Sequence, residues 1–321
     1  MKILIKNKSL ISILCAISAC FCFSLNDVMM KAFSSDYPLY ELTLFRSIVA
    51  LSVCLLIFIP LEGGIRILKT KNLGIHFFRG SCVVIANISF FAGIAVLPLA
   101  EATAIFFISP ILITIFSIVF LKESVGILRW TALIFGLLGV LLVIKPFGVS
   151  FRWEIIFPLT AALAYSSLQI LTRYLGVNEK AATMAFYIQI SFITYMGIFS
   201  IFFHDGNFDI VNHPSFEFFF KGWVWPNKYD LLVICFIGVF NAFGGYLISQ
   251  AYRLSFAGLV APFEYSALVF SIFWGIIILG EFLNFLSIIG IFIILVSGVF
   301  IAIRETIKDK PLSLKKIVDR R

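Results

Sequence analysis

The 321-residue chain has few charged side chains, which excludes most soluble folds. Charged residues make up 13% of the sequence and hydrophobic residues 61%, and the mean hydropathy is +1.06. Soluble domains carry about 25% charged and about 45–50% apolar residues, so the composition predicts a membrane protein. The apolar stretches are continuous instead of alternating, which excludes a transmembrane β-barrel.

The sequence also lacks the motifs of common enzymes and metal sites. Its three histidines are scattered, no HExxH or CxxC pattern occurs, and the six cysteines all lie in apolar runs. A Walker A sequence is absent, so this chain alone is not expected to hydrolyse ATP. We therefore expect no catalytic residues, no metal and no cofactor. An integral-membrane enzyme and a channel remain the rival function classes, and the enzyme would require clustered His or Asp motifs.

The apolar runs predict an all-α integral membrane fold with ten transmembrane helices. One crossing of a bilayer needs about 20 apolar residues. Runs of this kind occur at 9–32, 39–60, 74–97, 99–121, 127–145, 152–174, 181–203, 230–253, 257–280 and 284–303.

The positive charges predict the orientation of these helices. Ten crossings place both termini on one side, and 19 of the 25 Lys and Arg residues fall on that side against five on the other. Positive residues accumulate in cytoplasmic loops, so both termini are expected in the cytoplasm. The same rule explains the net charge of +8 without a nucleic-acid partner. The basic tail, 304–321, suits anionic lipid headgroups.

The two halves of the chain share landmarks. "PLAEATAIFFISPILITIFSIVFLKE" (Pro98–Glu123) and "SFAGLVAPFEYSALVFSIFWGIIILGE" (Ser255–Glu281) begin alike and both end on glutamate. An odd number of helices separates the two copies, so they would have opposite orientations in the membrane. Inverted repeats of this kind are typical of secondary transporters, with a site near the midplane. The repeats are predicted at 9–145 and 152–303.

These segments resemble the EamA-type branch of the drug/metabolite transporter superfamily, and "QAYRLSFAGLVAPFEYSALVFSIFWGIIILGE" (Gln250–Glu281) matches it closely. The resemblance covers about residues 9–305. It implies an inverted-repeat carrier of the bacterial inner membrane with a cavity between helices 1, 3, 4, 6, 8 and 9. The sub-pattern is similar to bacterial S-adenosylmethionine uptake carriers, with riboflavin and metallophore carriers as relatives. The expected function is alternating-access transport of a small polar metabolite, such as S-adenosylmethionine or a related cationic or zwitterionic compound. Export of amino acids, vitamins or drugs is the alternative.

Polar residues within the apolar helices are candidates for the site, because each one raises the cost of membrane insertion. Glu264 is the leading candidate, as a contact for a substrate cation or as a proton site. A salt bridge to Arg253 or a hydrogen bond is the structural alternative, and an ion pair with Lys31 is the alternative for Asp27. The predicted substrate-binding or cavity-lining residues are Asn26, Asp27, Asn87, Tyr165, Gln169, Asn241, Tyr246, Gln250, Glu264 and Tyr265.

Two arginines are candidates for a charge partner or a gate. Arg46 lies about two turns into the second predicted helix, and it is expected to pair with Glu41 or with an acid on a neighbouring helix. Arg253 ends the eighth helix. The expected partners are a small-molecule substrate and membrane lipids, with protons as the candidate coupling ion. The sequence leaves monomer and homodimer both open.

Overall fold

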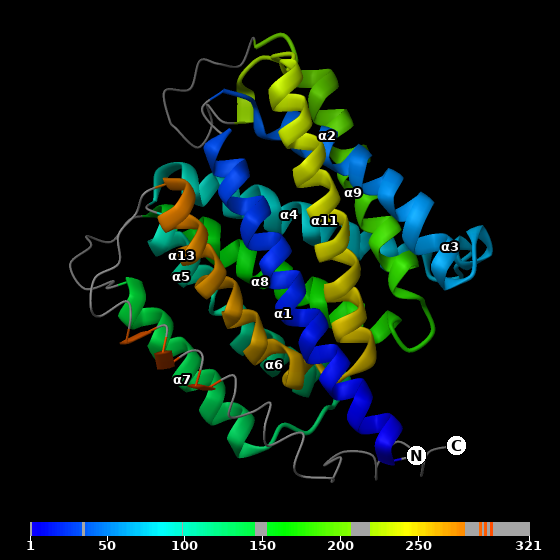
Figure 1. Ribbon diagram of the computed structural model, residues 1–321, viewed down its shortest axis with the longest axis vertical. Coiled ribbons are helices and arrows are strands. Elements are labelled where there is room, and N and C mark those ends of the chain that lie inside the picture. Colours follow the sequence, from blue (N-terminus) through cyan, green and yellow to red (C-terminus); the bar gives the residue numbers. More distant parts are fainter. Residues whose placement is uncertain are drawn as a thin grey trace.

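The computed structural model describes residues 2–33, 36–97, 99–144, 153–206 and 219–279, together with a few residues between 289 and 297. Over these residues the chain is helical and has no β-strand. The longer helices are α1 (Lys2–Ala32), α2 (Leu39–Val53), α4 (Leu73–Val96), α5 (Leu99–Phe106), α6 (Ser109–Leu121), α7 (Ile127–Ile144), α8 (Ile156–Leu175), α9 (Ala181–Phe203), α11 (Lys228–Leu254) and α13 (Ser266–Leu279) (Figure 1).

The predicted helix 39–60 continues from α2 through a π-helical turn, η1 (Cys54–Phe58), into the short α3 (Ile59–Glu62). Pro60 explains the irregular turn, because proline has no N–H to donate and its ring crowds the carbonyl four residues earlier. A 3₁₀ turn, η2 (Ile65–Leu68), then leads to α4. Glu62, the last residue of α3, contacts Ala182 on α9 and Tyr246 on α11.

Two predicted helices are interrupted. The helix expected at 99–121 is instead α5 and α6, separated at Phe107 and Ile108, because Pro110 cannot donate to the carbonyl of Phe106. The helix expected at 257–280 begins as α12 (Ala257–Val260) and passes through a 3₁₀ turn, η4 (Ala261–Tyr265), before α13. Pro262 starts this turn for the same reason, and Glu264 lies within it.

The first helix begins at Lys2 instead of residue 9, and the other described helices agree with the prediction within a few residues. Another 3₁₀ turn, η3 (Trp153–Ile155), precedes α8, and α9 has the predicted bounds. The predicted helix 284–303, apart from a few residues, and the tail 304–321 lie outside the described residues. Within the described part, seven helices are long and apolar enough to cross a membrane.

The distribution of side chains is that of a membrane protein. Large aliphatic side chains face outward, as Leu56 (78% exposed), Leu61 (77%) and Ile201 (72%) show. Charged and amide side chains lie inside, among them Arg46, Arg79 and Glu264. A soluble protein has the opposite preference, since buried charges are rare there. The chain is therefore a multi-span membrane protein with a polar interior.

Helix α1 crosses the centre of the bundle and packs against α11 and α13 (Figure 1). Glycines on α11 permit this close approach. A Cβ at Gly238 would lie 2.7 Å from the backbone oxygen of Arg46, and one at Gly244 would lie 2.8 Å from the ring of Phe23. These contacts fix α11 between α1 and α2, so that all three helices border the same interior space.

Candidate substrate cavity

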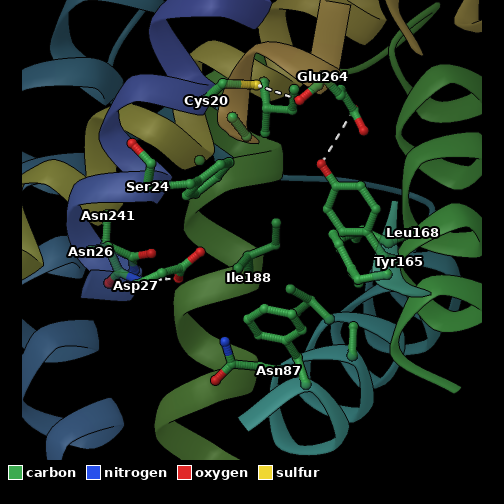
Figure 2. A pocket seen from close by; sticks show the side chains of 18 of the residues that line it. Cys20, Ser24, Asn26, Asp27, Asn87, Tyr165, Leu168, Ile188, Asn241 and Glu264 are labelled. Atoms are coloured by element: carbon green, nitrogen blue, oxygen red, sulfur yellow. Dashed lines mark hydrogen bonds between the residues drawn. The ribbon is translucent and has the colours of Figure 1, made fainter. Parts of the chain in front are cut away.

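A cavity of about 190 Å³ lies in the interior of the bundle. Its wall is formed by α1, α2, α4, α5, α8, α9, α11, the η4 turn and α13. These elements include the predicted helices 1, 3, 4, 6, 8 and 9, and they add the second and the seventh. The polar groups gather at two ends: Glu264 lies at one end, and Asn26, Asp27 and Asn87 lie at the other (Figure 2).

Glu264 is 4% exposed and is held by two tyrosines. Its Oε1 accepts a hydrogen bond from the Tyr252 hydroxyl at 2.6 Å and one from the Tyr165 hydroxyl at 3.3 Å. The Cys20 thiol donates to the backbone oxygen of Glu264 at 3.7 Å. Hydrogen bonding, one of the structural alternatives, is therefore what holds Glu264. Arg253 donates instead to Gln250 at 3.2 Å.

The opposite end is built around Arg46, which is 1% exposed. Its two terminal nitrogens donate to Asn26 Oδ1 at 2.7 Å and to Asn87 Oδ1 at 3.1 Å. Asn26 in turn donates to the Asp27 carboxylate at 2.9 Å. Glu41, the expected partner of Arg46 on its own helix, accepts instead from the backbone N–H of Val224.

The wall between these ends is mainly apolar and includes several aromatic rings. The Phe106 ring lies 5.1 Å from Phe90 and 5.4 Å from Tyr165, centroid to centroid, and Phe23 and Phe192 complete this wall. Such ring faces stack on planar groups and attract cations. A ligand in this space would therefore meet apolar rings along its length and charged groups at its two ends.

Three further amides line the cavity with an atom that lacks a partner. Within the described ranges, no hydrogen-bond partner is found for the buried Gln169 Nε2, Gln189 Oε1 and Asn241 Nδ2. Buried polar atoms are almost always hydrogen-bonded, since an unsatisfied one costs about 1–3 kcal/mol. These atoms are suited to bind a polar ligand or water.

Comparisons with known proteins agree with this architecture. The model of the EamA-like transporter family matches residues 10–145. An uncharacterized transporter from Helicobacter pylori (strain J99 / ATCC 700824) is 30% identical, and the alignment covers 97% of this chain and 100% of the relative. The chain belongs to the EamA-like transporter family.

Two other similarities bear on substrate and fold. The S-adenosylmethionine uptake transporter of Rickettsia prowazekii (strain Madrid E) is 26% identical over 88% of this chain and 89% of its own length. One solved crystal structure superimposes with a TM-score of 0.73 at 16% identity, covering 91% of this chain and 98% of that one. The latter similarity shows the fold alone. Together with the family membership, these findings identify a transporter of metabolite type.

Not every predicted site residue of this EamA-type chain lines the cavity. The residues that do are Asn26, Asp27, Arg46, Asn87, Tyr165, Gln169, Asn241 and Glu264. Tyr265 packs against Phe107, and its hydroxyl donates to the backbone oxygen of Leu133. Arg253, Tyr246 and Gln250 also lie elsewhere.

Tyr246 and Gln250 form a separate cluster around Glu62. Both donate to Glu62 Oε1, at 3.0 and 2.8 Å, while Glu62 Oε2 accepts the backbone N–H of Ala182 at 3.1 Å. The Tyr246 ring also stacks on Phe58 at 4.3 Å. This cluster joins α3, α9 and α11, and its hydrogen bonds are satisfied within the protein.

Three residues that line the cavity or contact Glu264 were not predicted from the sequence. Gln189 is an isolated amide in the apolar run "FYIQISF" and had the same signal as the predicted residues, but its helix was not expected to line a cavity. Cys20 was considered only as one of six cysteines in apolar runs, which indicate no metal site. Tyr252 gave no signal, because its contact with Glu264 depends on how the tight turn after α11 returns the chain.

Proposed function

We propose that this chain is a secondary carrier that moves a small cationic or zwitterionic metabolite across the bacterial inner membrane by alternating access. S-adenosylmethionine is the first substrate to test, because a relative of nearly equal length carries that name. Glu264 carries the proposal: an acid buried beside an aromatic cavity provides the negative charge that a cationic ligand requires. Export of amino acids, vitamins or drugs is the alternative within the same family.

The proposal includes ten helices in two inverted repeats with both termini in the cytoplasm. The bias of Lys and Arg supports this topology. Reporter fusions at the Lys69–Lys71 loop and after Lys310 should report the cytoplasm, and a fusion in the 205–228 loop should report the outside. An outside signal from the tail fusion would reverse the proposed orientation.

Uptake into proteoliposomes without ATP tests the function directly. Wild-type protein should accumulate labelled S-adenosylmethionine, and Glu264→Gln should lower the uptake at least about tenfold, equivalent to a loss of roughly 1.4 kcal/mol. The substitution keeps the size and hydrogen bonding of the side chain but removes its charge. Folding should be preserved, as judged by size-exclusion chromatography.

Glu62→Gln is the matched control, because Glu62 also accepts from a tyrosine hydroxyl but lies outside the cavity. Equal losses of uptake in both variants would assign Glu264 a bracing role. Repeating the assay with and without an imposed pH gradient tests protons as the coupling ion. A gradient-independent rate would remove proton coupling from the proposal.

A further inference from the structure

The end of the cavity opposite Glu264 contains both signs of charge in one small cluster. Asn26 links Arg46 on α2 to Asp27 on α1, because it accepts a hydrogen bond from the guanidinium and donates one to the carboxylate, while Asn87 on α4 accepts from the other terminal nitrogen of Arg46. Figure 2 shows Asn26, Asp27 and Asn87 around this end of the space. The four side chains come from three helices, so the cluster exists only when α1, α2 and α4 are assembled.

The arginine in this cluster has unused hydrogen-bonding capacity. Its Nε has no partner within the described ranges, although the side chain is 1% exposed. Its terminal nitrogens bind only neutral amide oxygens, at 2.7 and 3.1 Å. A guanidinium presents five N–H groups in a fixed fork that matches a carboxylate. Arg46 is therefore partly satisfied and can bind a carboxylate more strongly than it binds the amides.

Asp27 supplies the complementary group. Its carboxylate receives one hydrogen bond from Asn26 at 2.9 Å, and the side chain lines the cavity. An ammonium group placed there would meet the carboxylate of Asp27. A guanidinium and a carboxylate that are bridged by the Asn26 amide are complementary to the carboxylate and ammonium groups of a free α-amino acid.

We propose that Arg46, Asp27, Asn26 and Asn87 bind the α-carboxylate and α-ammonium groups of an amino-acid ligand. This assignment rests on the proposed transport function and specifies which part of the substrate lies at which end. It also fixes the ligand class as an α-amino acid with a long side chain that carries a cation or hydrogen-bond donors toward Glu264.

The length of the cavity fits this class. Cys20 contacts the backbone of Glu264 at one end, and Asp27 lies seven residues further along α1. At 1.5 Å per residue, these positions are roughly 10 Å apart along the helix axis. The aromatic wall occupies the space between them. A compact amino acid such as glycine would reach only one end.

Binding to purified full-length protein tests the assignment through pairs of ligands that differ only in the carboxylate. The probes are S-adenosylmethionine with its decarboxylated form, L-arginine with agmatine, and L-lysine with cadaverine. Wild-type protein should bind the carboxylated member of at least one pair about tenfold more tightly or better. Arg46→Gln should reduce that preference to within about threefold.

Arg79→Gln is the matched control, because Arg79 is also 1% exposed and lies outside the cavity. It should keep the carboxylate preference of any ligand that it still binds. A bracing role for Arg46 predicts instead that Arg46→Gln weakens both members of a pair equally and leaves the ratio unchanged. That result would overturn the assignment.

Asn87→Asp provides a test if Arg46→Gln does not fold. It places a carboxylate beside the guanidinium and should lower the carboxylate preference by competition. An unchanged preference would count against the assignment.

The outcomes separate the two proposals. Carboxylate-dependent binding of arginine or lysine without binding of S-adenosylmethionine keeps the cluster assignment and removes the proposed substrate. Binding of S-adenosylmethionine with no carboxylate preference keeps the proposed substrate and removes the cluster assignment. Failure of all three pairs to bind overturns the assignment.

Discussion

Arg46 and Arg79 are both 1% exposed, yet their surroundings differ in a way that separates ligand binding from framework. Arg79 donates from Nε to Thr172 at 2.7 Å, from one terminal nitrogen to the backbone oxygen of Met184 at 2.8 Å, and from the other to Ser249 at 3.3 Å. Arg46 donates to two asparagines and leaves its Nε without a partner in the described ranges.

The difference shows that burial alone does not identify a site residue. Arg79 joins α4, α8, α9 and α11 through acceptors that the protein itself supplies, so each of its three guanidinium nitrogens has a partner. Arg46 lines a cavity and keeps a free donor, a combination that costs stability unless a ligand or water completes it. For these two buried arginines, the one with a partner on every nitrogen lies outside the cavity, and the one with an unpartnered Nε in the described ranges lines it.

The largest expected effect is on stability, from Arg79→Ala. This change leaves the Met184 carbonyl and the Ser249 hydroxyl without their charged donor and creates a void. We expect the free energy of unfolding to fall by about 3 kcal/mol or more, since each unsatisfied buried group costs about 1–3 kcal/mol. Arg46→Ala should cost less than half as much, because its partners border the cavity, where water can replace it. Chemical denaturation in detergent measures the free energy of unfolding of both variants. Equal losses would contradict the different roles assigned to Arg79 and Arg46.

The packing beside Arg46 gives the next largest effect. In Gly238→Ala, the new methyl group would lie 2.7 Å from the Arg46 backbone oxygen and 2.7 Å from Val49 Cβ. Because the backbone of α2 would have to move, we expect a loss of about 1–3 kcal/mol. Gly245→Ala is the control, since its methyl group would meet only Gln189 Nε2 at 3.9 Å. Thermal unfolding should separate the two variants, and a stable Gly238→Ala protein would contradict the close packing.

The smallest effects are expected at the other end of the cavity. Tyr252→Phe removes the 2.6 Å hydrogen bond to Glu264, and Tyr165→Phe removes the 3.3 Å one. Hydrogen bonds to charged groups contribute about 1.5–3 kcal/mol, and shorter ones contribute more. Uptake should therefore fall about tenfold or more in Tyr252→Phe. The 3.3 Å bond of Tyr165 is long for an O–H···O bond and falls below this energy range, so Tyr165→Phe should lower uptake only about twofold to threefold. The reverse order would mean that Tyr165 contacts the substrate directly.

Much of the fold could be predicted because membrane helices are encoded locally. A run of apolar residues specifies a crossing wherever it packs, and the predicted helix 181–203 has the observed bounds of α9. Arg79 is a residue whose position could not be predicted from the local sequence. It was counted among the positive residues of the cytoplasmic side, but the structure buries it in the bundle. The other Lys and Arg residues still favour that side, so the predicted orientation is the same without Arg79.

The site was less predictable, because it depends on which faces of distant helices meet. The energetic cost of polar residues in apolar helices selected Asn26, Asn87 and Glu264, which line the cavity in the structure. The same reasoning selected Tyr246 and Gln250, which are interior but satisfied by Glu62. Sequence alone cannot separate these two situations, since both are polar residues on apolar helices.

The 3₁₀ turn at Ala261–Tyr265 has a geometric consequence for the last described crossing. A 3₁₀ helix advances about 120° per residue against about 100° in an α-helix, so five residues accumulate a rotation of roughly 100°. Side chains of α12 and α13 that would share one face of a continuous α-helix therefore point in directions about a quarter-turn apart. A helical wheel drawn through both segments assigns wrong neighbours beyond Pro262, including for Tyr265. Transferring the site to a relative by residue spacing is valid only where the relative keeps the same turn.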